Sequence, residues 1–387
     1  MKYDNTIDEL ILESNKYQHL WNKKPTFISD WMPAEQDIQP IRLINYDDKY
    51  INEYSYLYSI DDFGYKKYFN DFYKTFYKDE IPNFALFSNT TIALYLVFKK
   101  LMLSNTKNVL AFAPCYFTSD SALQSLNYNI TFYNLIRTED IDYDEICKII
   151  KTNNIQVILI TDPIYGTGVE IELNIYKRLI KICEKFNLTF VIDYAYGNMS
   201  WHNAEHILNY MLIKELSKYN IDYFLVDSLP KRLFLNGNKF ALIFGNKNNI
   251  SEIEQLSIFI EGSVMQPQFK KYIECYDVNN LVAINYVINN YCVIASNRFK
   301  LLKTFIADYD MKISNANSSI FVLLGIPRKN KPDKDLDFAK NLIAQRGVYL
   351  IPHSRYKYVD EHYFYFKVNL LIRPDMLFDA ISKIVWL

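Results

Sequence analysis

Residues 223–231 read YFLVDSLPK, an apolar run that ends at Asp227 and is closely followed by Lys231. The run predicts a short buried strand, with Lys231 near its carboxyl end. Burial disfavours the charge of a lysine, lowers the pKa of its amine and makes it a nucleophile that can form a Schiff base. The plainer interpretation is a lysine whose stem follows the strand end while its amine reaches water.

Short apolar runs alternate with helical patterns on both sides of this stretch. Strands are expected at 84–87, 108–113, 130–133, 156–161, 189–193, 223–227 and 240–244, and helices at 65–77, 91–100, 119–125 and 173–186. Such alternation predicts an α/β fold with a large doubly wound, mostly parallel sheet and helices on both faces.

The two ends of the chain are expected to form a smaller α+β domain. A long helical pattern at 279–305 leads to strands at 319–324 and 364–370 and helices at 336–346 and 376–384. Pro25, Pro33 and Pro40 argue against a long helix near the N-terminus. We therefore assign residues 1–50 and 301–387 to the small domain and residues 51–300 to the large one.

Composition excludes several classes of protein. The chain has 387 residues, is 50% hydrophobic and carries a formal net charge of -1, so nothing favours nucleic acid or an anionic membrane as a partner. Its five cysteines form no CxxC pair, which argues against a zinc site or a disulfide framework. Neither a signal peptide nor an apolar run of the roughly 18 residues needed to span a membrane is evident, and we expect a cytoplasmic protein.

Two polar segments follow the first predicted strands. SNTT at residues 88–91 precedes a helix, where backbone amides and hydroxyls can cradle a phosphate, although an ordinary helix cap is the simpler interpretation of this segment taken alone. Tyr116 follows the strand at 108–113 and could stack on a flat cofactor ring. In a chain with 33 tyrosines it could also be a packing residue.

Two further segments follow later strands. DPIYGTG at 162–168 could be no more than a turn. DYAY at 193–196 places Asp193 at the end of a buried strand, where an unpaired charge is costly. A cationic partner such as a pyridinium nitrogen is therefore expected, and a capping aspartate is the alternative.

Other catalytic signals are weak. His202 and His206 flank Glu205 and could share one helical face, but no third ligand lies near them, so we predict no metal site. The GxGxxG and GxSxG motifs of dinucleotide-binding proteins and α/β-hydrolases are absent.

Taken in order, these segments resemble the signature of the fold-type I pyridoxal-phosphate enzymes, specifically the class I and II aminotransferases. The resemblance extends from about residue 56 to the C-terminus. Its motifs are the phosphate turn at 89–91, the ring-stacking Tyr116, the Asn-Pro-x-x-Pro-Thr-Gly turn at 162–168, Asp-x-Ala-Tyr at 193–196 and Ser-x-x-Lys at 228–231.

The resemblance implies catalytic roles for three residues. Lys231 would hold pyridoxal 5'-phosphate as a Schiff base and then move the proton between the substrate Cα and the cofactor. Asp193 would keep the pyridine nitrogen protonated, which makes the ring an electron sink, and Tyr196 would bond the ring's 3-oxygen.

It also implies the residues that bind the cofactor. The phosphate would be held by Asn89, Thr90, Thr91 and Ser228, and Tyr116 would stack on the ring.

Three positions depart from the family pattern. Tyr165 stands where the family has the asparagine that bonds the 3-oxygen, and Gly166 replaces the next proline. Lys239 replaces a phosphate-binding arginine, and Lys367 replaces the arginine that clamps the substrate's α-carboxylate. Lysine supplies a point charge without the two-pronged hydrogen bonding of arginine. A compositional preference for lysine would explain both exchanges as well as a change in specificity does.

Two residues near these positions complete the prediction. Arg373 follows Lys367 at the start of the last helix, and we do not expect it to act as the clamp. Tyr58, before Phe63-Gly64, resembles the tyrosine that reaches the neighbouring subunit's site, which implies a homodimer.

The expected function is transamination between an amino acid and a 2-oxo acid. The altered positions Tyr165 and Lys367 leave open a pyridoxal-phosphate lyase, cyclase or oxidase of specialised amino-acid metabolism, since fold and cofactor do not fix the reaction. A non-catalytic relative is a third possibility, against which the retained Lys231 and Asp193 argue.

Overall fold

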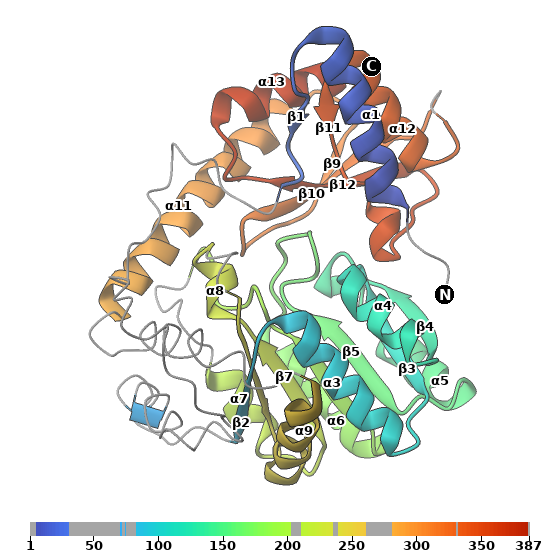
Figure 1. Cartoon of the computed structure of the whole chain (residues 1–387), viewed down its shortest axis with the longest axis vertical. Helices are drawn as coiled ribbons and strands as arrows, with labels where there is room; N and C mark the ends of the chain where they lie inside the picture. The colour runs from blue at the N-terminus through green and yellow to red at the C-terminus, as the bar shows by residue number, and fades with distance from the viewer. Residues whose placement is uncertain are drawn as a thin grey trace.

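A computed structural model describes residues 5–30, 70–71, 74, 83–202, 210–234, 239–260, 281–329 and 332–385. Figure 1 shows two lobes, with the large sheet in one and both ends of the chain in the other. In this part of the chain, no helix is long and apolar enough to cross a membrane.

The large lobe is built on a seven-stranded sheet in the order β2-β8-β7-β6-β5-β3-β4. All neighbouring strands run parallel except at β8, which is antiparallel to both β2 and β7. The strands are β2 (Phe84–Phe87), β3 (Asn108–Ala113), β4 (Asn129–Asn134), β5 (Val157–Thr161), β6 (Thr189–Asp193), β7 (Tyr223–Asp227) and β8 (Ala241–Gly245). The predicted doubly wound, mostly parallel sheet is confirmed.

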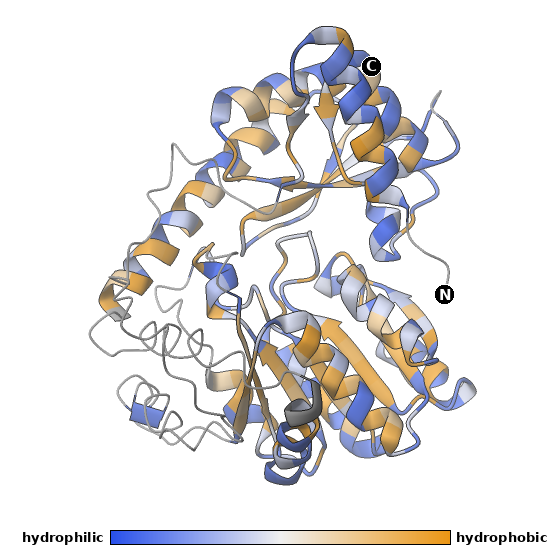
Figure 2. Ribbon diagram, viewed as in Figure 1, coloured by the Kyte–Doolittle hydropathy of each residue, from blue (hydrophilic) through white to orange (hydrophobic). Residues whose placement is uncertain are grey.

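Helices cover both faces of this sheet, because alternate strand residues point to opposite faces. Val109 and Ala111 of β3 join one apolar cluster with α3 (Thr90–Leu103), α4 (Phe117–Ser125) and α9 (Lys247–Ile260). Leu110 and Phe112 join the other, with α5 (Tyr143–Thr152), α6 (Leu173–Phe186) and α7 (Tyr210–Leu216). Figure 2 shows the central strands as mostly apolar and the helices as polar on their outer sides.

The small lobe brings the two ends of the chain together. Strand β1 (Thr26–Phe27) pairs in parallel with β11 (Val348–Tyr349), and α1 (Thr6–Trp21) packs on α12 (Asp335–Arg346). A second sheet has the order β12-β10-β9, formed by β9 (Lys312–Ile313), β10 (Phe321–Pro327) and β12 (Tyr363–Asn369). Helix α13 (Pro374–Val385) closes the lobe, and α11 (Leu281–Phe305) rises to it from the large lobe (Figure 1).

Most of the predicted elements are confirmed within two residues. The strand expected at 319–324 begins later, at Phe321, and the helix expected at 65–77 lies almost wholly outside the described residues. One expectation is wrong: α1 is a 16-residue helix near the N-terminus, which ends at Trp21, before Pro25. The prolines therefore limit this helix without preventing it.

Candidate active site

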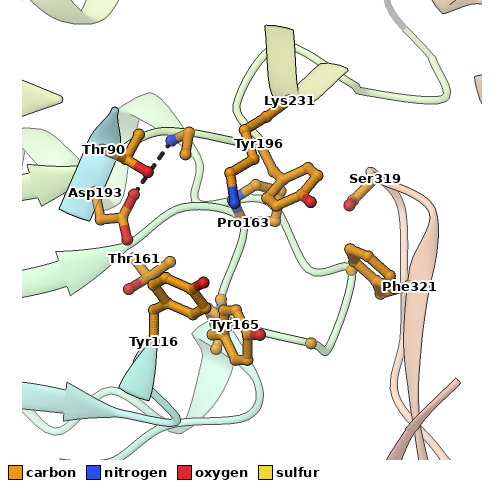
Figure 3. A pocket seen from close by; sticks show the side chains of 14 residues that line it. Thr90, Tyr116, Thr161, Pro163, Tyr165, Asp193, Tyr196, Lys231, Ser319 and Phe321 are labelled. Carbon is orange, nitrogen blue, oxygen red and sulfur yellow. Dashed lines mark hydrogen bonds between the residues drawn. The ribbon is translucent and has the colours of Figure 1, made fainter. Parts of the chain in front are cut away.

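The predicted segments meet in a cavity at the carboxyl ends of the parallel strands, as expected for an open α/β sheet. Its empty space, including the part that is open to solvent, amounts to about 510 Å³. Figure 3 shows its walls, which are formed by Thr90, Tyr116, Thr161, Pro163, Ile164, Tyr165, Gly166, Gly168, Asp193, Ala195, Tyr196, Lys231, Ser319 and Phe321.

Lys231 lies in the one-turn helix α8 (Leu229–Arg232), directly after β7. Its Nζ is 5.4 Å from the ring centre of Tyr116 and 5.5 Å from that of Tyr196. Burial lowers the pKa of the Lys231 amine, and the charge of Lys239 lowers it further, while Asp193 opposes both. A larger share of neutral, nucleophilic amine results.

A buried ion pair fixes α8 behind the lysine. Arg232 is fully buried and bonds both carboxylate oxygens of Asp227, at 2.5 and 3.1 Å. The same guanidinium donates to the Gly197 carbonyl at 3.2 Å. Lys231 is thus carried by a turn that is tied both to the end of β7 and to the segment after β6.

Asp193 ends β6 inside the cavity and is only 3% exposed. Its Oδ1 accepts a hydrogen bond from the Ala195 amide at 3.3 Å (Figure 3). Burial raises the pKa of Asp193 to about 6, although the Ala195 amide and Lys231 act in the opposite direction. The site therefore favours a cation beside this carboxylate.

Two tyrosines flank Lys231 and keep their protons. Burial raises the pKa of Tyr116 to about 12, and burial also raises the pKa of Tyr196. Both hydroxyls are therefore hydrogen-bond donors at neutral pH. Tyr196 packs edge to face against Phe321, and Tyr116 lies 5.4 Å from Tyr165 between ring centres.

A second cavity shares Thr90, Tyr116 and Lys231 with the first, and its empty space, including the part that is open to solvent, amounts to about 390 Å³. Its other walls are Asn89, Thr91, Ser228, Pro230, Lys239 and Phe240.

This second cavity lies at the N-terminus of α3. Asn89 caps the helix, because its Oδ1 accepts from the Ile92 amide at 2.9 Å and its carbonyl accepts from the Ala93 amide at 3.0 Å. The first amides of a helix have no partner within it, so those of Thr90 and Thr91 remain at the cavity. Amides, hydroxyls and the Lys239 charge make this end suitable for an anion. The capping and phosphate interpretations of SNTT are compatible.

The turn after β5 places Tyr165 and Gly166 in the cavity wall. Asp162, at its start, is buried and accepts from the Tyr176 hydroxyl at 2.8 Å and from the Ile171 amide at 3.0 Å. Burial and the nearby Glu170 raise the pKa of Asp162. Asp162 therefore supports the turn from behind and does not line the cavity.

Lys367 does not line the cavity either. It is fully buried, and its Nζ lies 4.4 Å from the ring centre of Phe321, which is itself a wall residue. Burial lowers the pKa of Lys367 well below its usual value, with further lowering by Lys231 and Arg355, while Asp30 opposes it.

Some predicted positions lie outside this picture. Tyr58, and His206 with Glu205, are outside the described residues, while His202 is exposed. Arg373 precedes α13 and pairs with Asp375 at 2.7 Å, away from the cavity. In the part of the chain that the structure describes, no group of three or more His, Cys, Asp or Glu could hold a metal ion.

Several wall residues carried no signal in the sequence. Ser319 and Phe321 reach the cavity from the small lobe. Ser319 lies just before β10, and Phe321 is its first residue. Thr161 is buried in the wall, and its hydroxyl has no hydrogen-bond partner among the described residues. Only the packing of one lobe on the other brings the first two to the site.

Comparisons with known proteins agree with this geometry. The model of the family "Aminotransferase class I and II" matches residues 7–370. A search of curated protein sequences gives no significant match.

Among solved structures, a single-mutant form of Thermus thermophilus aspartate aminotransferase has a TM-score of 0.81 at 12% identity. The match covers 100% of this chain and 97% of the aspartate aminotransferase chain. Alanine aminotransferase from Pyrococcus furiosus has a TM-score of 0.79 at 17% identity, with 98% and 96% covered. Escherichia coli YbdL, described as having a methionine aminotransferase function, has a TM-score of 0.78 at 13% identity, with 100% and 97% covered. At such identities these likenesses show the fold.

Proposed function

We propose that Lys231 is the central residue of an aminotransferase, because this chain belongs to the family of class I and II aminotransferases. The chain would transfer an amino group between an amino acid and a 2-oxo acid. One observation carries the role of Lys231: its amine, the Asp193 carboxylate and the rings of Tyr116 and Tyr196 share one cavity.

The residues of the two cavities fit pyridoxal phosphate, the cofactor associated with this family. Asp193 is a buried carboxylate suited to a ring cation, and the Thr161 hydroxyl lacks a partner among the described residues. The N-terminus of α3 and Lys239 suit a phosphate. When bound, the cofactor supplies an aldehyde that condenses with amines and a ring that withdraws electrons from the adjoining carbon.

We assign the binding residues accordingly. Tyr116 would cover the ring face, and Asp193 would pair with the ring nitrogen. Tyr165 and Tyr196 would donate to the ring's 3-oxygen. The phosphate end would be held by Asn89, Thr90, Thr91, Ser228 and Lys239.

Lys231 would move the proton. Its Nζ would take the proton from the substrate Cα and deliver a proton to the cofactor. This role needs an amine that is neutral part of the time. Burial provides this by lowering the pKa of Lys231. The Tyr116 and Tyr196 rings, whose centres lie 5.4 and 5.5 Å from the amine, would restrict it to the cavity and exclude water.

The test compares Lys231→Ala with Lys231→Arg, which keeps the positive charge but not the nucleophilic amine. Purified protein is mixed with pyridoxal phosphate, and the visible absorbance band of the lysine-bound cofactor is recorded. The parent should show the band and both variants should lose it. An unchanged spectrum in either variant would contradict the role of Lys231.

The departures at Tyr165 and Lys367 call for a second measurement, since they motivate the lyase, cyclase or oxidase alternative. The parent is mixed with single amino acids, and the cofactor is extracted and identified. Its amino form, together with the matching 2-oxo acid, supports transamination. Consumption of the amino acid without that form supports the alternative.

We also propose that the chain is a cytoplasmic homodimer. The dimer rests on the resemblance at Tyr58, and light scattering during gel filtration tests it. The cytoplasmic location rests on the cysteine pattern, and the four described cysteines are unpaired.

A further inference from the structure

His353 is a fully buried histidine next to the cavity wall, in the short helix η6 (His353–Tyr356) of the small lobe. An isolated bridge between Pro352 and Phe366 holds η6 against β12, so that His353 comes close to Lys367. The His353 ring lies 6.4 Å from that of Tyr165, and the two are stacked.

Gly166 is the residue that separates His353 from the cavity. A Cβ at this position would lie 2.7 Å from His353 Cε1 and 3.5 Å from both His353 Nε2 and Lys367 Cγ. Its φ is +75°, which glycine adopts freely and proline cannot. The loss of the family's proline and the presence of His353 therefore belong together, since only glycine leaves room for the imidazole.

The polarity of His353 is not explained by the packing around it. Neither ring nitrogen has a hydrogen-bond partner within 3.5 Å among the described residues, and a buried donor without a close partner is costly. Burial lowers the pKa of His353 to about 3, a longer hydrogen-bond contact with the Tyr165 main chain acts in the opposite direction, and the charge of Lys367 lowers the pKa further. The imidazole is therefore neutral at physiological pH, with one donor and one acceptor. An apolar side chain would fill the same space at less cost.

We propose that His353 donates an N–H to the substrate's carboxylate beside the amine of Lys367, so that the two together replace the arginine of the family. A carboxylate beside the Lys367 amine would favour its protonated form, so that the lysine supplies the charge and the imidazole supplies the directed hydrogen bond that a lysine lacks. This inference rests on the proposed function, because it concerns the α-carboxylate of an amino acid.

The carboxylate would reach the pair past Gly166, where the wall has no side chain. The Tyr165 ring lies beside Gly166 in this wall, with its centre 4.6 Å from that of Tyr356 and 5.4 Å from that of Tyr116.

The test measures carboxylate binding directly. The cofactor-loaded protein is titrated by calorimetry with 3-phenylpropionate, which has a carboxylate and an aromatic body but no amine. 3-Phenylpropan-1-ol is the matched probe without the carboxylate. His353→Phe keeps a ring without an N–H, and His353→Gln restores an N–H at a similar reach.

We expect His353→Phe to weaken 3-phenylpropionate binding by about ten-fold to a hundred-fold, the range for a hydrogen bond to a charged group. His353→Gln should recover most of this loss, and neither variant should change binding of the alcohol by more than about two-fold, since the alcohol makes no charged hydrogen bond. Thermal unfolding of each variant is followed in parallel.

Two results would overturn the inference. One is parent-like 3-phenylpropionate binding by His353→Phe. The other is an equal loss in His353→Phe and His353→Gln, for both probes, with lower melting temperatures, which would make His353 a packing residue. The proposed function fails separately, if the parent never acquires the absorbance band that depends on Lys231.

Discussion

Asp193 and Lys231 illustrate how one cavity perturbs two opposite charges. Burial raises the pKa of the carboxyl and lowers that of the amine, while each group's charge partly restores the other. Neither charge is fully compensated before a ligand arrives. A bound ring cation next to Asp193 would remove the larger share of this cost.

The raised pKa of Asp193 predicts that the stability of the cofactor-free protein depends on pH. The pKa of Asp193 is about 6 in the folded chain and 3.8 in the reference state, so the native form binds the proton more tightly. The free energy of unfolding should therefore fall as the pH rises from about 4 to about 6 and stay lower above it. Asp193→Asn should stabilise the cofactor-free protein at pH 7.5 by about 2–3 kcal/mol, and by little at pH 4.

Urea unfolding at the two pH values measures this difference. Loading with pyridoxal phosphate provides the control, because the parent should then gain more stability than Asp193→Asn. A variant that is less stable than the parent at pH 7.5 without cofactor would show that Asp193 is not strained by burial.

At the scale of elements, the one-turn helix α8 depends on the Arg232–Asp227 pair. Removing one partner of a buried pair leaves the other charge uncompensated, at a cost of about 3–5 kcal/mol. Asp227→Ala should therefore destabilise the protein by that amount and weaken the attachment of Lys231 to the cofactor. Both effects are read from urea unfolding and the absorbance band.

A matched double variant separates charge from packing. Asp227→Leu with Arg232→Met replaces both partners by apolar groups, and we expect it to be more stable than Asp227→Ala alone. If the single and double variants are equally unstable, the pair contributes by shape rather than by charge.

Strands and helices of the large lobe could be predicted because their burial follows from local patterns. β3, β6 and α6 coincide with the predicted ranges, since apolar runs and 3.6-residue periodicity are properties of the segment itself. Helix α1 could not be predicted in this way, because Leu10 is its only fully buried residue and the Asn5 side chain does not cap it. β1 and β11 are two residues each and exist only through pairing with each other.

The candidate site divides in the same way. Asp193 ends one strand of the large sheet, and Lys231 and Tyr116 each come shortly after another. Because the carboxyl ends of parallel strands share an edge, the meeting of these three residues could be predicted. His353 and Phe321 come from the small lobe, whose position no local pattern specifies. The burial of Lys367 likewise depends on this packing, and its role at the substrate stays a prediction.

At the scale of the whole molecule, hydrogen bonds join the two lobes across their boundary. The Gly168 carbonyl accepts from the amides of Asn317 and Ser318 at 3.0 and 2.9 Å, and Ser314 Oγ donates to the Thr167 carbonyl at 2.5 Å. Gly168 has no room for a side chain, since a Cβ would lie 2.3 Å from the Phe321 carbonyl oxygen. The wall of the cavity is therefore part of this boundary.

One apolar cluster also extends through both lobes, from Ile158 and Phe190 of the large sheet to Leu342 and Phe366 of the small lobe. We predict that the lobes unfold together in a single transition, because separating them would expose this cluster and break the boundary bonds. Far-ultraviolet circular dichroism, which follows the helices, and near-ultraviolet circular dichroism, which follows aromatic packing, should then give the same melting curve.

Trp201 makes this prediction sharper, because it lies at the boundary. Its Nε1 donates to the Ser319 carbonyl at 2.8 Å, and its ring packs 5.3 Å from that of Phe299. Trp201→Phe removes the hydrogen bond, at a cost of about 1 kcal/mol, and keeps a ring in place. In a single cooperative transition this local loss lowers both melting curves equally. If only the near-ultraviolet curve shifts, or the parent shows two steps, the lobes unfold separately and the cavity can open without global unfolding.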